Sequence, residues 1–581
     1  MNYINEIAKL IKIQGVEPCD IESSLTTAAD SSFGDYSLPC FKFSKALRQA
    51  PNAIAARIAD GIESAKPDFL ESVEAVGGYV NFSLDKKLFS TLTLGEIFQR
   101  AGEYGNSDEG AGKTVCIDFS SINIAKPFHI GHLGTTVIGA ALYRIFKKLG
   151  YNAVGINHLG DFGTQFGKLI VAYKLWGDAD DIKKRGLKAL VDIYVRFHKE
   201  EEQDAGLTAR AREWFLKIER GQEEAVALFN FFKEVTMKEV EQTYRRLGVT
   251  FDSYAGESFY NDKMQPVIDE LKQKDLLKLS DGASIVDLSR FDMPPCLILR
   301  SDGASLYATR DLATIFYRKK TYDFDKCLYV VAYQQNLHFK QVFKVIELLG
   351  YEYHKDLIHV AYGMVSLEDG AMATRKGNMV YLSDVLDRAA QKSLAIIREK
   401  SPDLKDAEAV AEAVGVSAVI FSALINNRIK DNVFTYEKIL NFDGETGPYL
   451  QYTCARCHSI IEKALGAFAA DGSQAALYPS LAEALKSADA DALTAPDAYE
   501  VIKLLGKYPD VIRAAKENYE PSLVTRHLID IAQSYNKFYF DNRILDERSG
   551  VKNARVAITA AVKEVLKNGF EVLGLRVVER M

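Results

Sequence analysis

The fold is decided by residues 118–132, which read Asp118-Phe119-Ser120-Ser121-Ile122-Asn123-Ile124-Ala125-Lys126-Pro127-Phe128-His129-Ile130-Gly131-His132. This stretch begins at the end of an apolar, strand-like pattern, continues through polar residues and enters a helical pattern. In an open α/β sheet, ligands bind beyond the carboxyl ends of the strands, where helix N-termini favour phosphate groups. We therefore expect a nucleotide site at this strand-to-helix turn.

Two histidines, His129 and His132, stand three residues apart at the start of the predicted helix, so both can face one ligand. Gly131 leaves room there for a flat base, and imidazole N–H groups can donate to polyphosphate oxygens and stabilise charge in a transition state. The bare pattern would also fit two structural histidines or half of a metal site. Its setting, with a polar strand end and Lys126 beside it, favours the nucleotide site.

The segments around this turn alternate between strand and helix. Strand patterns cover residues 114–119 and 152–157, with a helical pattern at 131–149 between them. The same alternation returns as helix 312–320, strand 327–332, helix 339–349 and strand 357–362. Two separated βαβ halves predict one parallel, Rossmann-type sheet with an insertion between them.

The rest of the chain indicates three further parts. Residues 3–61 read as helical and 72–84 as strand-like, 166–295 is mostly amphipathic helix, and nearly everything beyond 401 is helical. Residues 102–112 are the best linker candidate in the first half. The expected fold is α/β: a Rossmann-type parallel-sheet catalytic domain with a helical insertion, an α+β N-terminal domain and an all-α C-terminal bundle. The expected boundaries are 1–106 for the N-terminal domain, 107–165 with 296–400 for the catalytic domain, 166–295 for the insertion and 401–581 for the bundle.

Composition narrows the class of protein. With 581 residues, of which 48% are hydrophobic and 26% charged, the chain can bury several cores, which excludes a disordered protein. A net charge of −7 argues against indiscriminate nucleic-acid binding but leaves room for one local basic face. The sequence shows neither a basic, apolar leader nor about 18 uninterrupted apolar residues, so we expect a cytoplasmic protein without a membrane segment. The seven cysteines then read as reduced thiols.

Two short motifs suggest other chemistries. The run Cys454-Ala455-Arg456-Cys457-His458 matches the attachment pattern of c-type haem, but it lies in a helical pattern and no export signal accompanies it. Zinc would need a second ligand pair, so no metal site is expected. Asp161-Phe162-Gly163 is also found in kinases, but no His-Arg-Asp loop and no Walker A string occur.

The stretch at 118–132 closely resembles the HIGH signature of class I aminoacyl-tRNA synthetases, and its Ser-x-Asn-Ile-Ala-Lys-Pro-Phe is similar to the arginyl-tRNA synthetase version. Residues 160–167 and 306–313 also match that family. Residues 372–378 follow the last predicted strand, where the family has its mobile KMSKS loop, although Ala371 replaces the lysine before Met372. Lys126 stands where arginyl enzymes carry a compensating lysine. Ile122 replaces the usual proline and Phe162 the usual tryptophan, two apolar exchanges.

The resemblance implies a residue for each task. The catalytic residues would be His129, His132, Lys126 and Lys376, and ATP would bind Phe128, Gly131, His338 and Met372. Arginine would bind Asp118, Ser121 and Asn123 through its backbone end, and Tyr307, Asp311 and Gln335 through its guanidinium. A guanidinium is planar, forked and always charged, so carboxylate and carbonyl acceptors with an aromatic wall suit it.

The RNA contacts would come from the two ends of the chain. Aromatic stacking and basic groups are what single-stranded RNA needs, although each aromatic could instead belong to a core. By resemblance, the tRNA-binding residues would be Phe33 in the N-terminal domain and Tyr452, Arg456, Tyr539 and Met581 in the bundle.

The family implies ATP-dependent ligation of L-arginine to its cognate tRNA through arginyl-adenylate, with ATP as substrate and Mg²⁺ as cofactor. We expect a monomer. Another class I synthetase or a nucleotidylyltransferase could use the same His-x-Gly-His device. A non-catalytic RNA-binding paralogue could keep the scaffold, although such a module needs neither the histidines nor Asp311.

Overall fold

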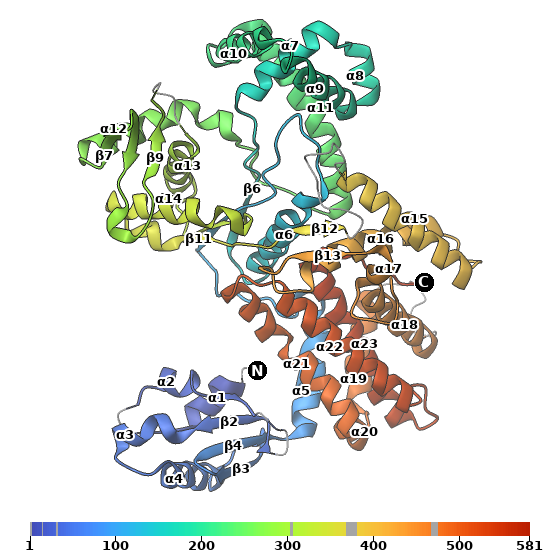
Figure 1. The fold of residues 1–581 in the computed structure, drawn as a ribbon. Coiled ribbons are helices and arrows are strands. Elements are labelled where there is room, and N and C mark those ends of the chain that lie inside the picture. Colours follow the sequence, from blue (N-terminus) through green and yellow to red (C-terminus); the bar gives the residue numbers. More distant parts are fainter. Residues whose placement is uncertain are drawn as a thin grey trace. The chain divides into compact units, whose positions relative to one another are not determined.

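The computed structural model describes residues 3–13, 16–28, 30, 33–301, 306–367, 380–465 and 474–581 (Figure 1). The chain forms two compact units. The first comprises residues 1–101, 460–506 and 534–561, and the second comprises 102–459, 507–533 and 562–581.

The first unit carries a four-stranded antiparallel sheet with the order β1-β2-β4-β3. Its elements are α1 (Tyr3–Leu10), α2 (Pro18–Glu22), β1 (Thr26–Thr27), β2 (Tyr36–Pro39), α3 (Ser44–Leu47), α4 (Pro51–Glu63), β3 (Leu70–Val76), β4 (Tyr79–Leu84), α5 (Lys86–Arg100), α19 (Gln474–Lys486) and α20 (Ala490–Thr494). Gly77 and Gly78 form the β3–β4 turn with φ of 58° and 84°, which suits a tight hairpin. The predicted helical pattern over residues 3–61 holds at α1 to α4 but was wrong at β1 and β2, which are too short to show a period.

The second unit contains the expected parallel sheet, with the order β11-β10-β5-β6. Its strands are β5 (Thr114–Asp118), β6 (Asn152–Ile156), β10 (Lys326–Tyr329) and β11 (Leu357–His359), connected by α6 (Leu133–Lys148), α13 (Tyr307–Tyr322) and α14 (Asn336–Leu348). The two βαβ halves are therefore confirmed, with ends shifted by a few residues. Asp118 pairs with Tyr329, so both halves of the sequence meet at the carboxyl end of the sheet.

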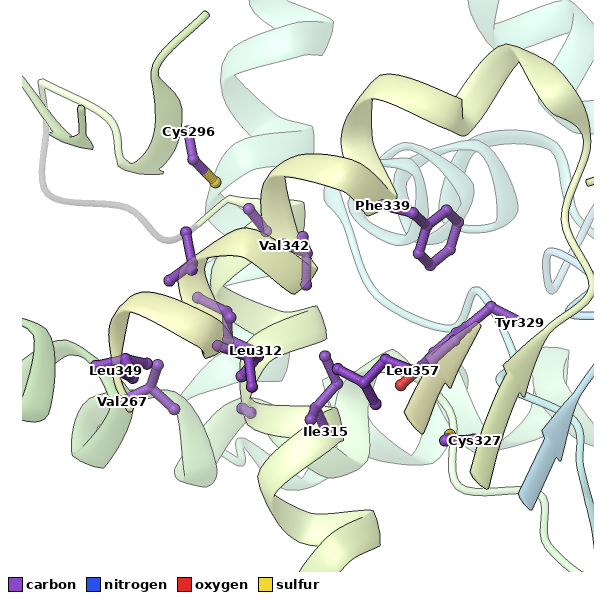
Figure 2. Close-up of a cluster of buried hydrophobic side chains, with 14 of the residues drawn as sticks. Val267, Cys296, Leu312, Ile315, Cys327, Tyr329, Phe339, Val342, Leu349 and Leu357 are labelled. Carbon is purple, nitrogen blue, oxygen red and sulfur yellow. The ribbon is translucent and has the colours of Figure 1, made fainter. Parts of the chain in front are cut away.

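A buried apolar cluster ties the second half to the sheet (Figure 2). Leu312 and Ile315 from α13 and Val342 from α14 are at most 1% exposed and share this cluster with Tyr329 of β10. The helices that begin at the carboxyl end of the sheet are thus fixed against the strands, which orients the residues at their N-termini.

The insertion is helical with one exception. Its helices are α7 (Thr164–Trp176), α8 (Ala179–Arg185), α9 (Leu187–Glu201), α10 (Ala205–Glu219), α11 (Glu223–Leu247) and α12 (Met264–Gln273), and α7 to α11 gather together in Figure 1. The exception is the pair β7 (Leu277–Ser280) and β8 (Ala283–Val286), which forms an antiparallel sheet with β9 (Cys296–Leu299), just beyond the expected boundary at 295. These strands were not predicted, because each has only four residues and shows no period.

Beyond residue 401 the chain is mainly helical, as predicted, and the helix α15 (Leu382–Lys400) lies just before it. The further elements are α16 (Ala407–Leu424), α17 (Tyr436–Ile439), α18 (Gly447–Leu465), α21 (Pro496–Glu517), α22 (Ser522–Asp541) and α23 (Ser549–Leu573), while β13 (Asn432–Phe434) pairs with β12 (Val365–Leu367). Helix α16 is long and apolar enough to cross a membrane, but 78% of it is buried inside the protein, as in a core helix. Cys454 and Cys457 are buried in α18.

Residues 102–112, the linker candidate, begin directly after the first stretch of the first unit ends at residue 101, and they form packed turns of the second unit. Tyr104 is 2% exposed and stacks on Tyr508 with 6.1 Å between ring centroids. At Gly110, a Cβ atom would lie 2.2 Å from the ring of Tyr151. The polar composition that suggested a linker therefore belongs to tightly packed turns.

We expect Gly139→Ala to destabilise the second unit by about 1–3 kcal/mol, because its Cβ would lie 2.2 Å from Cβ of Phe119 in the adjoining segment. Gly95→Ala in α5 is the matched control, because no atom of the described residues lies within 4 Å of a Cβ placed there. It should be neutral or stabilising by up to about 1 kcal/mol. Thermal unfolding monitored by circular dichroism measures both, and equal midpoints would contradict the prediction.

Candidate active site

The turn after β5 is held in an unusual backbone conformation. Ser120 and Ser121 have φ of 71° and 43°, a region that costs free energy for residues other than glycine. The Ser120 N–H donates to Oγ1 of Thr135 at 2.9 Å, and its Oγ lies 2.9 Å from Oγ1 of Thr136 and 2.7 Å from the hydroxyl of Tyr244. Contacts from α6 and α11 therefore stabilise a strained turn at the site that the sequence predicts.

The turn brings three of the expected residues to the strand end. The hydroxyl of Ser121 donates to Oδ1 of Asp118 at 2.8 Å. Asn123 forms a bridge with Gly160, where a Cβ atom would lie 2.4 Å from Oδ1 of Asn123. Glycine at position 160 is thus required for this close approach.

The main partner of Asp118 was not predicted from the sequence. Arg318 of α13 is completely buried, and its Nη2 donates to Oδ2 of Asp118 at 2.6 Å. No local pattern indicates this pair, because 200 positions separate the two residues. Arg318 follows Asp311 by seven positions, a helical spacing that places both on one side of α13.

The two histidines lie together at the start of the helix. The N–H of Gly131 donates to Nδ1 of His129 at 3.1 Å, and the N–H of His129 donates to Nδ1 of His132 at 3.3 Å. Since Nδ1 accepts in each ring, Nε2 carries the proton in the neutral form. Burial, helped by His129, lowers the pKa of His132 to about 3, and burial together with Lys126 also lowers the pKa of His129. At pH 7 the pair offers two neutral N–H donors.

Phe128 and Lys126 flank the histidines differently. Phe128 is buried, with its ring 5.5 Å from the His132 ring and 5.3 Å from the Tyr244 ring. Lys126 is exposed. The structure therefore places Phe128 in packing contact with His132, while Lys126 is open to a ligand.

The residues expected to read the guanidinium lie at the starts of α13 and α14. Nε2 of His338 is 2.6 Å from Oδ2 of Asp311, so the structure brings an expected nucleotide residue and an expected arginine residue together. Tyr307 is 70% exposed, and Gln335 is exposed in the turn before α14. These side chains are accessible to a ligand.

His158, just after β6, was also missed. Burial lowers its pKa, Asp118 and Asp311 raise it, and Arg318 lowers it, so this ring lies within electrostatic reach of all three groups. The signal was available, because His158 directly follows a predicted strand at the same end of the sheet.

A second group of charged residues that was not predicted lies next to the segment 160–167. Asp161 accepts hydrogen bonds from Lys233 at 2.7 Å and from the backbone of Ser258 at 2.8 Å. Burial raises the pKa of Glu257 to about 7, opposed by Arg310, whose guanidinium is 3.8 Å from it. The Arg310 guanidinium also lies 4.5 Å from the ring centroid of Phe162, which lines a cavity of about 210 Å³.

Of the expected tRNA-binding residues, Phe33, Tyr452 and Tyr539 are 52%, 41% and 38% exposed. The guanidinium of Arg456 lies 4.9 Å from the Tyr452 ring centroid, and Met581 packs on a buried cluster that includes Val414. The three aromatic rings are therefore accessible, whereas Met581 is partly buried. Met372 and Lys376 lie outside the described residues. Among the described residues, no group of three or more His, Cys, Asp or Glu side chains is placed to hold a metal ion.

Comparison with known proteins identifies the family. Residues 93–436 match the model of the class I (R) tRNA synthetase catalytic domain, 450–581 match the DALR anticodon binding domain, and 2–84 match the arginyl tRNA synthetase N terminal domain. The arginine–tRNA ligase of Halothermothrix orenii is 48% identical over 562 residues, which cover 97% of this chain and 96% of the relative. That of Clostridioides difficile is 47% identical, covering 98% of each chain.

A solved structure shares the fold. The arginyl-tRNA synthetase of Thermus thermophilus superposes with a TM-score of 0.81 at 24% identity, covering 100% of this chain and 99% of that one. Together with the matching family models and relatives, the strand-end site supports one assignment. The chain belongs to the arginyl-tRNA synthetases, the class I enzymes that use ATP to join arginine to tRNA.

Proposed function

We propose that both steps of arginylation take place at the carboxyl ends of β5, β6 and β10. In the first step, a carboxylate oxygen of arginine attacks the α-phosphorus of ATP in line, and pyrophosphate leaves as arginyl-adenylate forms. In the second, a terminal ribose hydroxyl of tRNA attacks the arginyl carbonyl, and AMP leaves. The neutral histidine pair is the observation that carries this proposal, because donors fixed in advance stabilise the charge that develops on the phosphate.

The substrate arginine would be held at its two ends. Asp118, Ser121 and Asn123 would bind its backbone end at the strained turn. Tyr307, Asp311 and Gln335 would bind the guanidinium, with Asp311 oriented by His338. A carboxylate, a side-chain carbonyl and an aromatic wall suit the forked guanidinium of arginine. Such a pocket distinguishes arginine from lysine, because the compact ammonium of lysine cannot form paired hydrogen bonds.

ATP would lie over the helix start. His129, His132 and Lys126 would contact its phosphates, and Gly131 would leave space for its base. Phe128 would pack against the ring of His132. Lys376 and Met372, in the sequence before α15, would add contacts, as would His338 from α14. Mg²⁺ would enter with the polyphosphate, its usual route in sites that lack a dedicated carboxylate cage.

The domains would divide the contacts with tRNA. Residues 1–106 would reach the elbow of tRNA with Phe33, and 401–581 would bind the anticodon with Tyr452, Arg456, Tyr539 and Met581. The catalytic domain would comprise 107–165 with 296–400 and the connecting insertion 166–295. The matches of the N-terminal and DALR models to the two ends of the chain support this division. We also propose a monomer acting in the cytoplasm.

Arginine-dependent exchange of pyrophosphate into ATP tests the proposal directly. We expect exchange with arginine and none with lysine, measured with and without cognate tRNA. Pyrophosphate exchange that does not depend on arginine would point to another nucleotidyl-transfer reaction. Tight tRNA binding with no exchange under any condition would favour a non-catalytic RNA-binding paralogue and would contradict the proposed site.

A further inference from the structure

We propose that Arg318 is a positioning residue, which fixes the carboxylate of Asp118 in the orientation that receives the amino group of the substrate arginine. The inference rests on the proposed role of Asp118 in binding that amino group. Arg318 itself would touch no substrate, because its side chain is completely buried.

The geometry gives each oxygen of Asp118 its own partner. Nη2 of Arg318 donates to Oδ2 at 2.6 Å, and the hydroxyl of Ser121 donates to Oδ1 at 2.8 Å. A carboxylate has roughly four acceptor positions, so two remain for a ligand after these bonds. The orientation of the free positions is fixed from one side by α13 and from the other by the strained turn.

The surroundings hold Arg318 in place as a charged group. Its guanidinium lies 5.3 Å from the ring centroid of Tyr329, the residue that pairs with Asp118 on the neighbouring strand. Burial lowers the pKa of Arg318, but Asp118 together with the smaller effects of Tyr329, Tyr260 and Cys327 raises the pKa well above its usual value. The guanidinium is therefore charged at every pH at which the protein is folded.

Stability alone explains this pair poorly. Burying two charges costs hydration, and replacing a buried ion pair by apolar side chains is often neutral or stabilising. Arg318 neutralises the charge of Asp118, so the pair carries little net charge. What it offers a ligand is a hydrogen-bond acceptor with a fixed direction. A carboxylate fixed in this way at the strand end favours a ligand whose hydrogen-bond donor lies in line with its free acceptor positions. The α-amino group of an amino acid is such a donor.

The test compares arginine with 5-guanidinopentanoic acid, which lacks only the α-amino group. Calorimetry on the full chain should show that wild type prefers arginine by at least about tenfold, the worth of one hydrogen bond to a charged group. Arg318→Lys keeps the charge, but its different head group does not place a donor where Nη2 meets Oδ2 of Asp118, so it should lower this preference at least about fivefold. Its affinity for the analogue should change by less than about twofold. In pyrophosphate exchange, KM for arginine should rise while KM for ATP stays constant.

A control and a second variant separate the possible outcomes. Arg246→Lys removes a paired contact with Glu412 (2.9 and 3.0 Å) away from the strand end and should leave the preference intact. Arg318→Gln, which keeps a donor toward Asp118, should retain part of the preference and serves if the lysine variant does not fold. An equal loss of affinity for both ligands would overturn the positioning role. No preference in wild type would instead refute the proposed contact of Asp118 with the amino group.

Discussion

Alanine in place of His132 is expected to lower kcat of arginine activation at least about tenfold, or about 1.4 kcal/mol of transition-state stabilisation. The reason is the loss of the Nε2–H donor, since Nδ1 already accepts from the backbone of His129. Affinity for tRNA should stay nearly unchanged, because His132 lies at the start of α6 and not in the helical end of the chain. Pyrophosphate exchange at saturating arginine and ATP measures the effect.

Two controls make the result specific. His132→Gln places an amide N–H near the position of Nε2 and should retain more activity than alanine. His354→Ala removes a histidine that faces Glu347 at 3.6 Å, outside the proposed site, and should leave kcat unchanged. Equal turnover by His132→Ala and wild type would refute the assignment of His132.

The pH dependence of kcat checks the charge state of the same ring. Burial lowers the pKa of His132 to about 3, so the neutral donor form persists as the pH falls and is lost only near that value. No decrease in kcat between pH 8 and pH 6 should therefore arise from His132. An acid limb near pH 6.5 in wild type that disappears in His132→Gln would contradict the neutral pair.

Hydrophobic period explains which parts of the fold were predictable. The parallel sheet was found because its strands alternate with helices long enough to show a 3.6-residue repeat, as at α14. The β1–β2 pair and the β7–β8–β9 sheet were missed because strands of two to four residues carry no period. The polar residues of the strained turn indicated its position in the sequence. They did not indicate its backbone conformation at Ser120 and Ser121.

The candidate site divides in the same way. His129 and His132 could be predicted because they are three positions apart on one turn. Arg318 could not, because its contact with Asp118 forms only when α13 packs on the sheet. The pairing of His338 with Asp311 likewise joins two helix starts, and no sequence pattern indicates it.

Asparagine in place of Asp311 is expected to raise KM for arginine by about 10- to 100-fold, the worth of a hydrogen bond to a charged group. The substitution keeps the size of the side chain and removes the negative charge that would face the guanidinium. KM for ATP should stay within about twofold of wild type, because only uniform binding of arginine is lost. Pyrophosphate exchange with each substrate varied in turn measures both constants.

Citrulline separates a loss of charge recognition from a general disturbance of the pocket. It has the shape of arginine but carries a neutral ureido group, so wild type should bind arginine far better. Asp311→Asn should narrow that preference at least about tenfold, whereas a collapsed pocket would weaken both ligands alike. His338→Gln, which keeps a donor to the 2.6 Å contact with Asp311, should preserve the preference. If Asp311→Asn still prefers arginine as strongly as wild type does, another acidic group reads the guanidinium, and Asp311 then serves only to fix the start of α13 against His338.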